Sequence, residues 1–329
     1  MVSAPDGTGR PGDDPLDVLA AALGSRAVRH APLGARTTYR VGGSASVLVE
    51  VDGEDDLQAV HRALAGAGGC VPVLVLGNGS NMLVADTGFD GLVVAPGVGL
   101  AAIDIAGTKV RAGGAANFPL VARRSAAAGL VGLEWAVGIP GTVGGALKMN
   151  AGGHGSETAT VLTRQRTFDL RSGEVTEAGP ERLALGYRSS SIDGGDVVVW
   201  AEFALSVGPR QEAEATVAEI VRWRRAHQPG GSNAGSVFKN PAGDSAGRLV
   251  EAAGLKGFRL GSARVSEKHA NFIQADEGGR AEDVKRLIDH VRLKVRDGSG
   301  VELVPEVRLV GFGEEVAGEP STSSGGSSS

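Results

Sequence analysis

The chain of 329 residues is short of several residue types, and each shortage excludes a class of protein. Its single cysteine, Cys70, allows no internal disulfide, and the six histidines have no spacing that indicates a metal site. No run approaches the roughly 18 apolar residues that span a bilayer, and the first fifteen residues lack the basic and apolar regions of a signal peptide. We therefore expect a cytoplasmic protein without a metal centre.

The chain also lacks a large excess of charge of either sign. The 33 basic residues are interspersed with 38 acidic ones, for a net charge of −5, and form no concentrated basic face. Nucleic acids and anionic membranes usually require such a face in the proteins that bind them. The composition therefore favours chemistry on small molecules, and it indicates no obligate protein partner.

Glycine, by contrast, is abundant, with 52 residues, and two clusters of it have the pattern of anion-binding loops. The first cradle is Gly77-Asn-Gly-Ser-Asn-Met82, and the second is Gly138-Ile-Pro-Gly-Thr-Val-Gly-Gly145. Successive small residues let backbone amides converge on a phosphate. One such loop alone is more often a tight turn, but two indicate a long phosphorylated ligand such as FAD. The candidate contacts are Gly77, Asn78, Gly79, Ser80, Asn81, Met82, Gly138, Ile139, Pro140, Gly141, Thr142, Gly144, Gly145 and Asn150.

A third glycine motif, Gly97-Val-Gly-Leu-Ala-Ala102, has the spacing of a dinucleotide-binding fingerprint but the wrong surroundings. Pro96 precedes it, and the following residues 103–112 are broken by Gly107. They favour a turn and a strand over the helix that the fingerprint needs. We therefore do not expect a Rossmann-type NAD site.

The predicted elements indicate an α+β chain. Residues 47–51 have the pattern of a strand, 55–65 of a helix and 71–76 of a second strand, which together predict a βαβ unit ending at the first cradle. Asn117 is a candidate cap for a helix that ends near Gly129. Later elements are predicted as strands at 160–169 and 197–205 around a turn-rich 171–179, helices at 212–225, 245–253 and 281–296, and strands at 271–274 and around Glu306.

The pattern divides the chain into two ordered domains between disordered ends. Residues 1–15 and 316–329 are rich in Gly, Pro and Ser and are expected to be disordered. Residues 16–211 are expected to form one domain with two lobes, at about 16–97 and 98–211, and residues 212–315 a smaller one. The boundary is placed near Gly208-Pro209.

Three residues outside the cradles carry candidate chemistry. Ser236 lies in Gly235-Ser-Val-Phe-Lys-Asn-Pro241, and Glu306 lies in Val304-Pro-Glu-Val307. Arg188 is a candidate carboxylate clamp, because its guanidinium is a rigid two-pronged donor. Each alone is more often a turn hydroxyl, an edge-strand carboxylate or a surface arginine, but together they indicate an enzyme. No histidine has the spacing of a Ser-His-Asp triad, so acyl transfer is not indicated.

In their order along the chain, these motifs resemble the UDP-N-acetylenolpyruvoylglucosamine reductase (UDP-N-acetylmuramate dehydrogenase) family of peptidoglycan precursor synthesis. The resemblance covers roughly residues 33–312. Its seven motifs are Thr37-Thr-Tyr-Arg-Val-Gly-Gly43, residues 77–84, residues 138–145 with Met149-Asn-Ala-Gly152, Tyr187-Arg188, residues 234–241, His269-Ala-Asn-Phe-Ile273 and Pro305-Glu-Val307. Since Tyr39 and Tyr187 are the only tyrosines, the resemblance is to the short form that lacks an inserted tyrosine loop.

The resemblance implies a two-lobed FAD-binding domain of the vanillyl-alcohol oxidase type, followed by a smaller α+β substrate-binding domain. It also implies NADPH-dependent reduction of UDP-N-acetylglucosamine enolpyruvate. Ser236 would be the proton donor, while Arg188 and Glu306 would polarise the substrate carboxylate. The cradles and Arg308 would contact FAD. The residues implied to face the UDP-sugar are Lys239, Asn240, His227 and His269.

Two other functions stay open at this point. One is an FAD-dependent alcohol or sugar oxidase with the same cofactor fold, although such an enzyme needs a base, and the set Ser236, Arg188 and Glu306 suits reduction of an unsaturated acid better. The other is a flavin-free binding protein that retains the fold.

Overall fold

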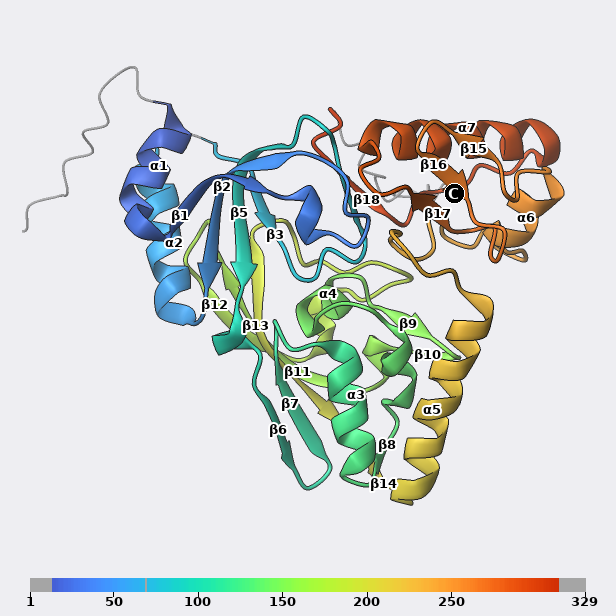
Figure 1. The fold of residues 1–329 in the computed structure, drawn as a ribbon. Helices are drawn as coiled ribbons and strands as arrows, with labels where there is room; N and C mark the ends of the chain where they lie inside the picture. Colours follow the sequence, from blue (N-terminus) through green and yellow to red (C-terminus); the bar gives the residue numbers. More distant parts are fainter. Residues whose placement is uncertain (1–13, 69, 314–329) are drawn as a thin grey trace, which may run out of the picture.

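The computed structural model describes residues 14–68 and 70–313 (Figure 1). The segments 1–13 and 314–329, most of what was expected to be disordered, lie outside the described residues. Asp14 and Pro15 do not fit that expectation, because they begin the first helix: the Asp14 carboxylate accepts a hydrogen bond of 2.9 Å from the backbone N–H of Leu16. An acidic cap followed by proline is a common helix start.

The first lobe contains the predicted βαβ unit. Its elements are α1 (Pro15–Leu23), β1 (Ala27–Pro32), β2 (Ser44–Val51), α2 (Glu54–Gly66), β3 (Val73–Val75), β4 (Met82–Val84) and β5 (Phe89–Pro96), with short 3₁₀ turns η1 (Gly24–Arg26) and η2 (Gly34–Arg36). β5 lies between β2 and β3 and is parallel to both, in the sheet order β1-β2-β5-β3. Leu57, Val60 and Ala63 of α2 are buried in the core beside this sheet. The first cradle therefore follows the carboxyl end of β3.

The second lobe is built on an antiparallel sheet of order β12-β11-β13-β7-β6. Its elements are η3 (Val98–Leu100), β6 (Ile103–Ala106), β7 (Lys109–Gly113), α3 (Phe118–Ala127), β8 (Leu130–Val131), η4 (Glu134–Gly138), α4 (Val143–Lys148), β9 (Gly152–Gly153), β10 (Ser156–Glu157), η5 (Thr158–Thr160), β11 (Leu162–Asp169), β12 (Val175–Ala178), η6 (Pro180–Leu183), β13 (Asp196–Ala204), β14 (Ser206–Val207) and α5 (Arg210–His227). β6 and β7 form a hairpin where a Rossmann motif would need a helix, as predicted. β12 was missed, because its pairing with β11 decides its structure more than its turn-rich sequence does.

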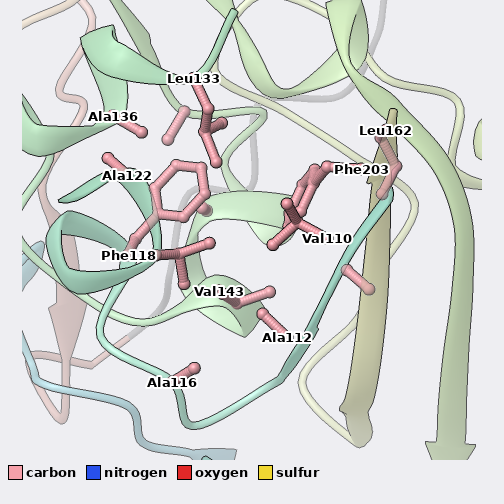
Figure 2. Packing of buried hydrophobic residues seen from close by; sticks show 14 of the residues in the cluster. Val110, Ala112, Ala116, Phe118, Ala122, Leu133, Ala136, Val143, Leu162 and Phe203 are labelled. Atoms are coloured by element: carbon pink, nitrogen blue, oxygen red, sulfur yellow. The ribbon is translucent and has the colours of Figure 1, made fainter. Parts of the chain in front are cut away.

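The core of this lobe gathers around Phe118 of α3 (Figure 2). The Phe118 ring lies 5.7 Å from Trp135 in an edge-to-face arrangement and 5.9 Å from Phe203 of β13. Such aromatic pairs add to the free energy of burial. The helix and the sheet are thereby fixed to each other beneath the second cradle.

Helix α5 also packs on this core, which corrects the expected domain boundary. Ala213, Val217 and Ile220 of α5 are buried in the cluster that contains Phe118. Figure 1 shows α5 running along the second lobe and ending near the smaller domain. The boundary between 211 and 212 therefore separates α5 from its own core. Gly208-Pro209 marks the start of a helix, but it does not reveal on which core that helix packs.

The smaller domain packs a helix against a three-stranded sheet and then returns to the first lobe. Its elements are α6 (Ala246–Ala252), β15 (Arg259–Leu260), β16 (Ala263–Val265), β17 (Ile273–Ala275), α7 (Ala281–Ser299) and β18 (Arg308–Val310). β18 pairs in parallel with β4, with Arg308 opposite Met82. Glu306 was expected within a strand, but it lies in the loop before β18 because the paired residues start at Arg308.

Within the described ranges, no helix combines the length and the apolar character that a bilayer crossing requires.

Candidate active site

A cavity of about 570 Å³ is lined by residues from all three parts of the chain. This volume is in the range of small-molecule sites. Both glycine cradles contribute to its wall, together with the loop that holds Ser236 and the loop that precedes β18. A second cavity of about 500 Å³ adjoins it, because Gly77, Asn78 and Thr142 line both.

The first cradle requires glycine for close approach of the backbone. Gly79 has a φ of +57°, and a Cβ there would lie 2.7 Å from the carbonyl oxygen of Arg36. A Cβ on Gly77 would lie 2.7 Å from Oγ1 of Thr142 in the second cradle. Because a side chain at either position would collide with neighbouring protein atoms, glycine lets these segments pack closely beside the cavity.

The second cradle is joined to the first by its geometry and by a hydrogen bond. Gly141 has a φ of +128°, and a Cβ there would lie 2.9 Å from Oγ of Ser80. Ser80 Oγ donates to the carbonyl oxygen of Pro140 at 2.9 Å. Thr142 Oγ1 accepts a hydrogen bond of 3.3 Å from the N–H of Gly145 and so caps α4. The two cradles form one continuous wall.

This wall fits a phosphorylated dinucleotide such as FAD. Two glycine-rich segments, in which Cβ atoms would clash, face one cavity that continues into a second. Every residue predicted to contact the cofactor lines the cavity, Arg308 included, except Asn150. Asn150 is completely buried instead.

The structure brings Arg188 and Glu306 into contact. Arg188 Nε lies 2.9 Å from Oε1 of Glu306, and their side chains are only 21% and 18% exposed. Arg188 Nη2 also donates to the carbonyl oxygen of Gly152 at 2.8 Å. Arg188 has a φ of +53°, in the left-handed region that non-glycine residues rarely occupy. Backbone strain of this kind is often found at functional sites.

Glu306 is a carboxyl group in a mostly buried, positively charged setting. Burial raises its pKa, while Arg188 and Lys239 lower it, and the net pKa lies above the ordinary value for glutamate. Its backbone is held on both sides: the N–H of Glu306 donates to Val237 at 2.7 Å, and its carbonyl oxygen accepts from Nδ2 of Asn81 at 3.0 Å. The first cradle therefore fixes the position of Glu306.

Ser236 lines the same cavity, just after Gly235, whose φ is +76°. In the part of the chain that the structure describes, no group forms a hydrogen bond with the Ser236 hydroxyl. The hydroxyl is therefore available to a bound substrate.

The residues expected to face the UDP-sugar do not line the cavity. Asn240 Oδ1 accepts from the N–H of Ala246 at 3.1 Å and supports the start of α6. His269 packs edge-to-face with Phe272, and burial lowers its pKa. His227 stacks on Trp223 with ring centroids 4.7 Å apart. Lys239 acts on the site through its charge, because it lowers the pKa of Glu306.

Sequence reasoning missed the end of α5, which supplies Trp223, Arg224 and Gln228 to the cavity wall. Burial lowers the pKa of Arg224. No carboxylate within the described ranges pairs with this guanidinium, whose Nε donates to Oε1 of Gln228 at 2.8 Å. The run of basic residues at 222–225 was the available signal, but only the packing of α5 shows which of them faces the cavity. The other wall residues that were missed include Gly114, Lys148, His154, Asp196 and Phe272.

Two known families match the sequence. The family described as "FAD binding domain" matches residues 45–179, and the one described as "UDP-N-acetylenolpyruvoylglucosamine reductase, C-terminal domain" matches residues 227–310. UDP-N-acetylenolpyruvoylglucosamine reductase of Rubrobacter xylanophilus is 44% identical over 282 residues, which are 85% of this chain and 94% of the relative. The chain belongs to the UDP-N-acetylenolpyruvoylglucosamine reductase family.

Further members of the reductase family are similar to this protein over most of its length. The protein of that name from Paramagnetospirillum magneticum is 40% identical over 306 residues, or 93% of this chain and 98% of the relative. The crystal structure of the Thermus caldophilus reductase has a TM-score of 0.75 at 36% identity and covers 87% of this chain and 99% of that one.

These matches confirm the predicted α+β fold, with an FAD-binding domain before a smaller domain. They also support FAD as the cofactor. The second family match begins at residue 227, where α5 ends. This agrees with a domain boundary after α5.

Proposed function

We propose that the protein reduces UDP-N-acetylglucosamine enolpyruvate to UDP-N-acetylmuramate in peptidoglycan precursor synthesis, with NADPH as hydride donor and FAD as bound cofactor. The observation that carries this proposal is the contact of Arg188 with Glu306 on a cavity wall that also holds Ser236 and both glycine cradles. Family membership supports the same reaction.

Arg188 is suited to hold the substrate through its carboxylate. When bound, FAD supplies hydride transfer between NADPH and the β-carbon of the enolpyruvyl group. As the carbon–carbon double bond becomes single, its electron pair moves onto the α-carbon and the carboxylate. The Arg188 guanidinium opposes that growing negative charge, in the manner of an oxyanion hole.

Glu306 and Ser236 handle protons in this account. Because its pKa is raised, Glu306 retains a proton more readily than an exposed glutamate and can donate a hydrogen bond to the substrate carboxylate. Ser236 Oγ–H gives its proton to the α-carbon, and the alkoxide left behind is reprotonated from water. A serine hydroxyl is a weak acid, so the step depends on close placement against a strongly basic carbon.

The end of α5 is the best candidate for the nucleotide part of the substrate. Arg224 is a partly buried cation without a carboxylate partner in the described ranges, and a diphosphate would supply the missing charge. Gln228 accepts a hydrogen bond from Nε of Arg224 and so holds the guanidinium in place. The exposed Trp223 lies on the same cavity wall. We infer that these residues face the UDP diphosphate, while Lys239 acts on Glu306 through its charge.

The substrates are small and polar, and NADPH and UDP-sugars are compounds of the cytoplasm. We infer a cytoplasmic location from this chemistry and from the single unpaired cysteine, Cys70.

The test is turnover with the purified protein, NADPH and UDP-N-acetylglucosamine enolpyruvate. The proposal predicts NADPH oxidation that matches formation of a product with a saturated lactyl ether, identified by mass and proton spectra. Turnover of an alcohol or sugar with oxygen and without NADPH would support an oxidase instead. A protein that takes up no FAD would support a binding function.

A further inference from the structure

Asn150 follows α4 and is completely buried, although it belongs to a motif expected to contact the cofactor. Both ends of its amide are used inside the protein. Nδ2 donates to the carbonyl oxygen of Gly186 at 3.0 Å, and Oδ1 accepts from the N–H of Ala159 at 3.0 Å. Its φ of +38° is one that asparagine tolerates better than most residues. Asn150 therefore joins three segments of the chain.

One of these segments is the tight turn that carries Arg188. Gly186 and Ser189 exchange two backbone hydrogen bonds, of 3.0 and 3.2 Å, and Arg188 lies between them with its left-handed φ. A backbone in that region persists only where the surroundings hold it. The Asn150 amide bonds to the carbonyl oxygen of Gly186, which lies at the base of this turn.

Two further hydrogen bonds fasten the same two segments together. Arg188 Nη2 donates to the carbonyl oxygen of Gly152, and Ser190 Oγ donates to that of Lys148, each at 2.8 Å. Residues 148–152 begin at the last residue of α4, a helix that starts at the second cradle. The segment that cradles the cofactor thus continues into the support of Arg188.

We propose that Asn150 is a positioning residue for Arg188: its amide holds the turn 186–189 against residues 148–152 and so sets the guanidinium at contact distance from Glu306. The inference rests on the proposed function, since it assigns Arg188 to the substrate carboxylate. Asn150 itself touches neither substrate nor cofactor in this account.

The pKa of Glu306 should change if Asn150 positions Arg188, and this change distinguishes a positioning role from a general loss of stability. The positive groups that act on Glu306 are Arg188, in contact with it, and Lys239, which acts through its charge. Arg308, two residues further along the chain, lines the same cavity. If Arg188 moves away, Glu306 loses the strongest group that opposes the effect of burial, and its pKa rises further. The limb of the pH profile that reports Glu306 then moves to higher pH, whichever protonation state is active.

The test compares Asn150→Gly with Thr158→Val. Glycine accepts a positive φ, and the substitution removes the side chain together with its amide. Thr158 is equally buried and donates to the carbonyl oxygens of Ala146 and Ala151 in the same region, but it has no bond to the turn 186–189. In Asn150→Gly, we expect the UDP-substrate half-reaction to slow about 10-fold to 100-fold, as for a misplaced catalytic group. Its pH limb should move upward, and FAD affinity and NADPH-driven bleaching of the flavin band should stay unchanged.

A double-mutant cycle gives the second readout. Because Asn150 is argued to act through Arg188, Asn150→Gly should have little further effect in an Arg188→Ala background. Additive losses, an unmoved pH limb or an equal effect of Thr158→Val would overturn the proposal. Should Asn150→Gly not fold, Asn150→Asp keeps the acceptor for Ala159 but not the donor to Gly186, and the cycle is repeated with it.

Hydrogen exchange of the backbone amides at 186–190 separates this inference from the proposed reaction. We expect faster exchange there in Asn150→Gly than in Thr158→Val. Faster exchange in a protein whose wild type does not turn over the UDP substrate would leave positioning intact and contradict the proposed function. Unchanged exchange in an active protein would contradict the positioning role alone.

Discussion

At the scale of single residues, the hydroxyl proposed to protonate the substrate carbon stands apart from the ion pair of the site. Ser236 has a free hydroxyl on the cavity wall, whereas Arg188 and Glu306 are committed to each other. Only the step that protonates the substrate should need the serine. The two halves of the catalytic cycle are therefore expected to respond differently to its removal.

We predict that Ser236→Ala leaves bleaching of the flavin band by NADPH intact and slows the UDP-substrate half-reaction by about 10²-fold to 10⁴-fold, the usual range for a lost general acid. Rapid-mixing absorbance measures each half separately. Equal loss in both halves would mean that Ser236 supports the structure of the cavity and donates no proton.

The partly buried guanidinium of Arg224 leads to a second prediction at this scale. Arg224→Ala should raise KM for the UDP substrate about 10-fold to 100-fold, because a charged hydrogen bond in a partly buried site is lost. Arg225 is the matched control, since it is exposed and absent from the cavity wall. Steady-state kinetics with both variants checks this. Similar KM values for the two would remove Arg224 from the nucleotide site.

At the scale of elements, one arginine ties the two lobes together. Arg166 on β11 makes two hydrogen bonds to Glu54 on α2, of 2.8 and 2.9 Å, and a longer contact to Glu177 on β12. The hydrogen bond from Arg166 lowers the pKa of Glu54. The pair therefore stabilises the fold above the ordinary pKa of glutamate, and this contribution is lost as pH falls through the lowered pKa.

Arg166→Lys should lower the free energy of unfolding by about 0.2–1 kcal/mol at neutral pH, because an ammonium cannot bond both oxygens. The difference from wild type should vanish once Glu54 is protonated. Denaturant unfolding at neutral and acid pH measures this. Arg26→Lys serves as control, since Arg26 makes a single contact of 3.0 Å to Asp56, which lies on α2 as Glu54 does. A difference that persists at acid pH would exclude the ion pair as its cause.

Local sequence signals predicted elements well where the structure depends on neighbouring residues. Asn117 caps α3 by accepting from the N–H of Leu120, and the hairpin of β6 and β7 stands where Gly107 broke the helical pattern. Long-range packing decided the rest. β12 exists through its pairing with β11, and α5 belongs to the second lobe through its buried face.

The site shows the same division. Motif order was sufficient to indicate the cradles, Arg188, Ser236 and Glu306, all of which line the cavity. Motif order also assigned Asn150 to the cofactor. The fold shows instead that the Asn150 amide bonds to a turn 36 residues away, which no local sequence signal reveals. Arg224 was missed for a related reason, because a basic helix end does not reveal which side chain faces inward.

At the scale of the whole molecule, the smaller domain is connected to the first lobe as well as to α5. β18 pairs with β4, and Arg308 donates its N–H to the carbonyl oxygen of Asn81 at 3.0 Å. Tyr39 of the first lobe is also buried in the core of the smaller domain. Glu306 lies in the loop that leads from the smaller domain into β18, so its position depends on how the smaller domain and the first lobe are joined.

Removal of residues 308–329 should therefore weaken FAD binding, lower the melting temperature and abolish turnover, because β4 loses its partner and Glu306 its anchor. Removal of 314–329, which lie outside the described residues, is the length control. Calorimetry and flavin titration compare the two truncated proteins. The same behaviour in both would show that β18 does not hold the site together.

In the proposed catalytic cycle, one cavity serves two half-reactions, oxidation of NADPH and reduction of an enolpyruvyl UDP-sugar. Anaerobic double-mixing stopped-flow tests it most directly, with NADPH added first and UDP-N-acetylglucosamine enolpyruvate second. Under this cycle, flavin absorbance should fall with NADPH and recover only when the UDP substrate is added. Loss of absorbance without substrate-dependent recovery would contradict it.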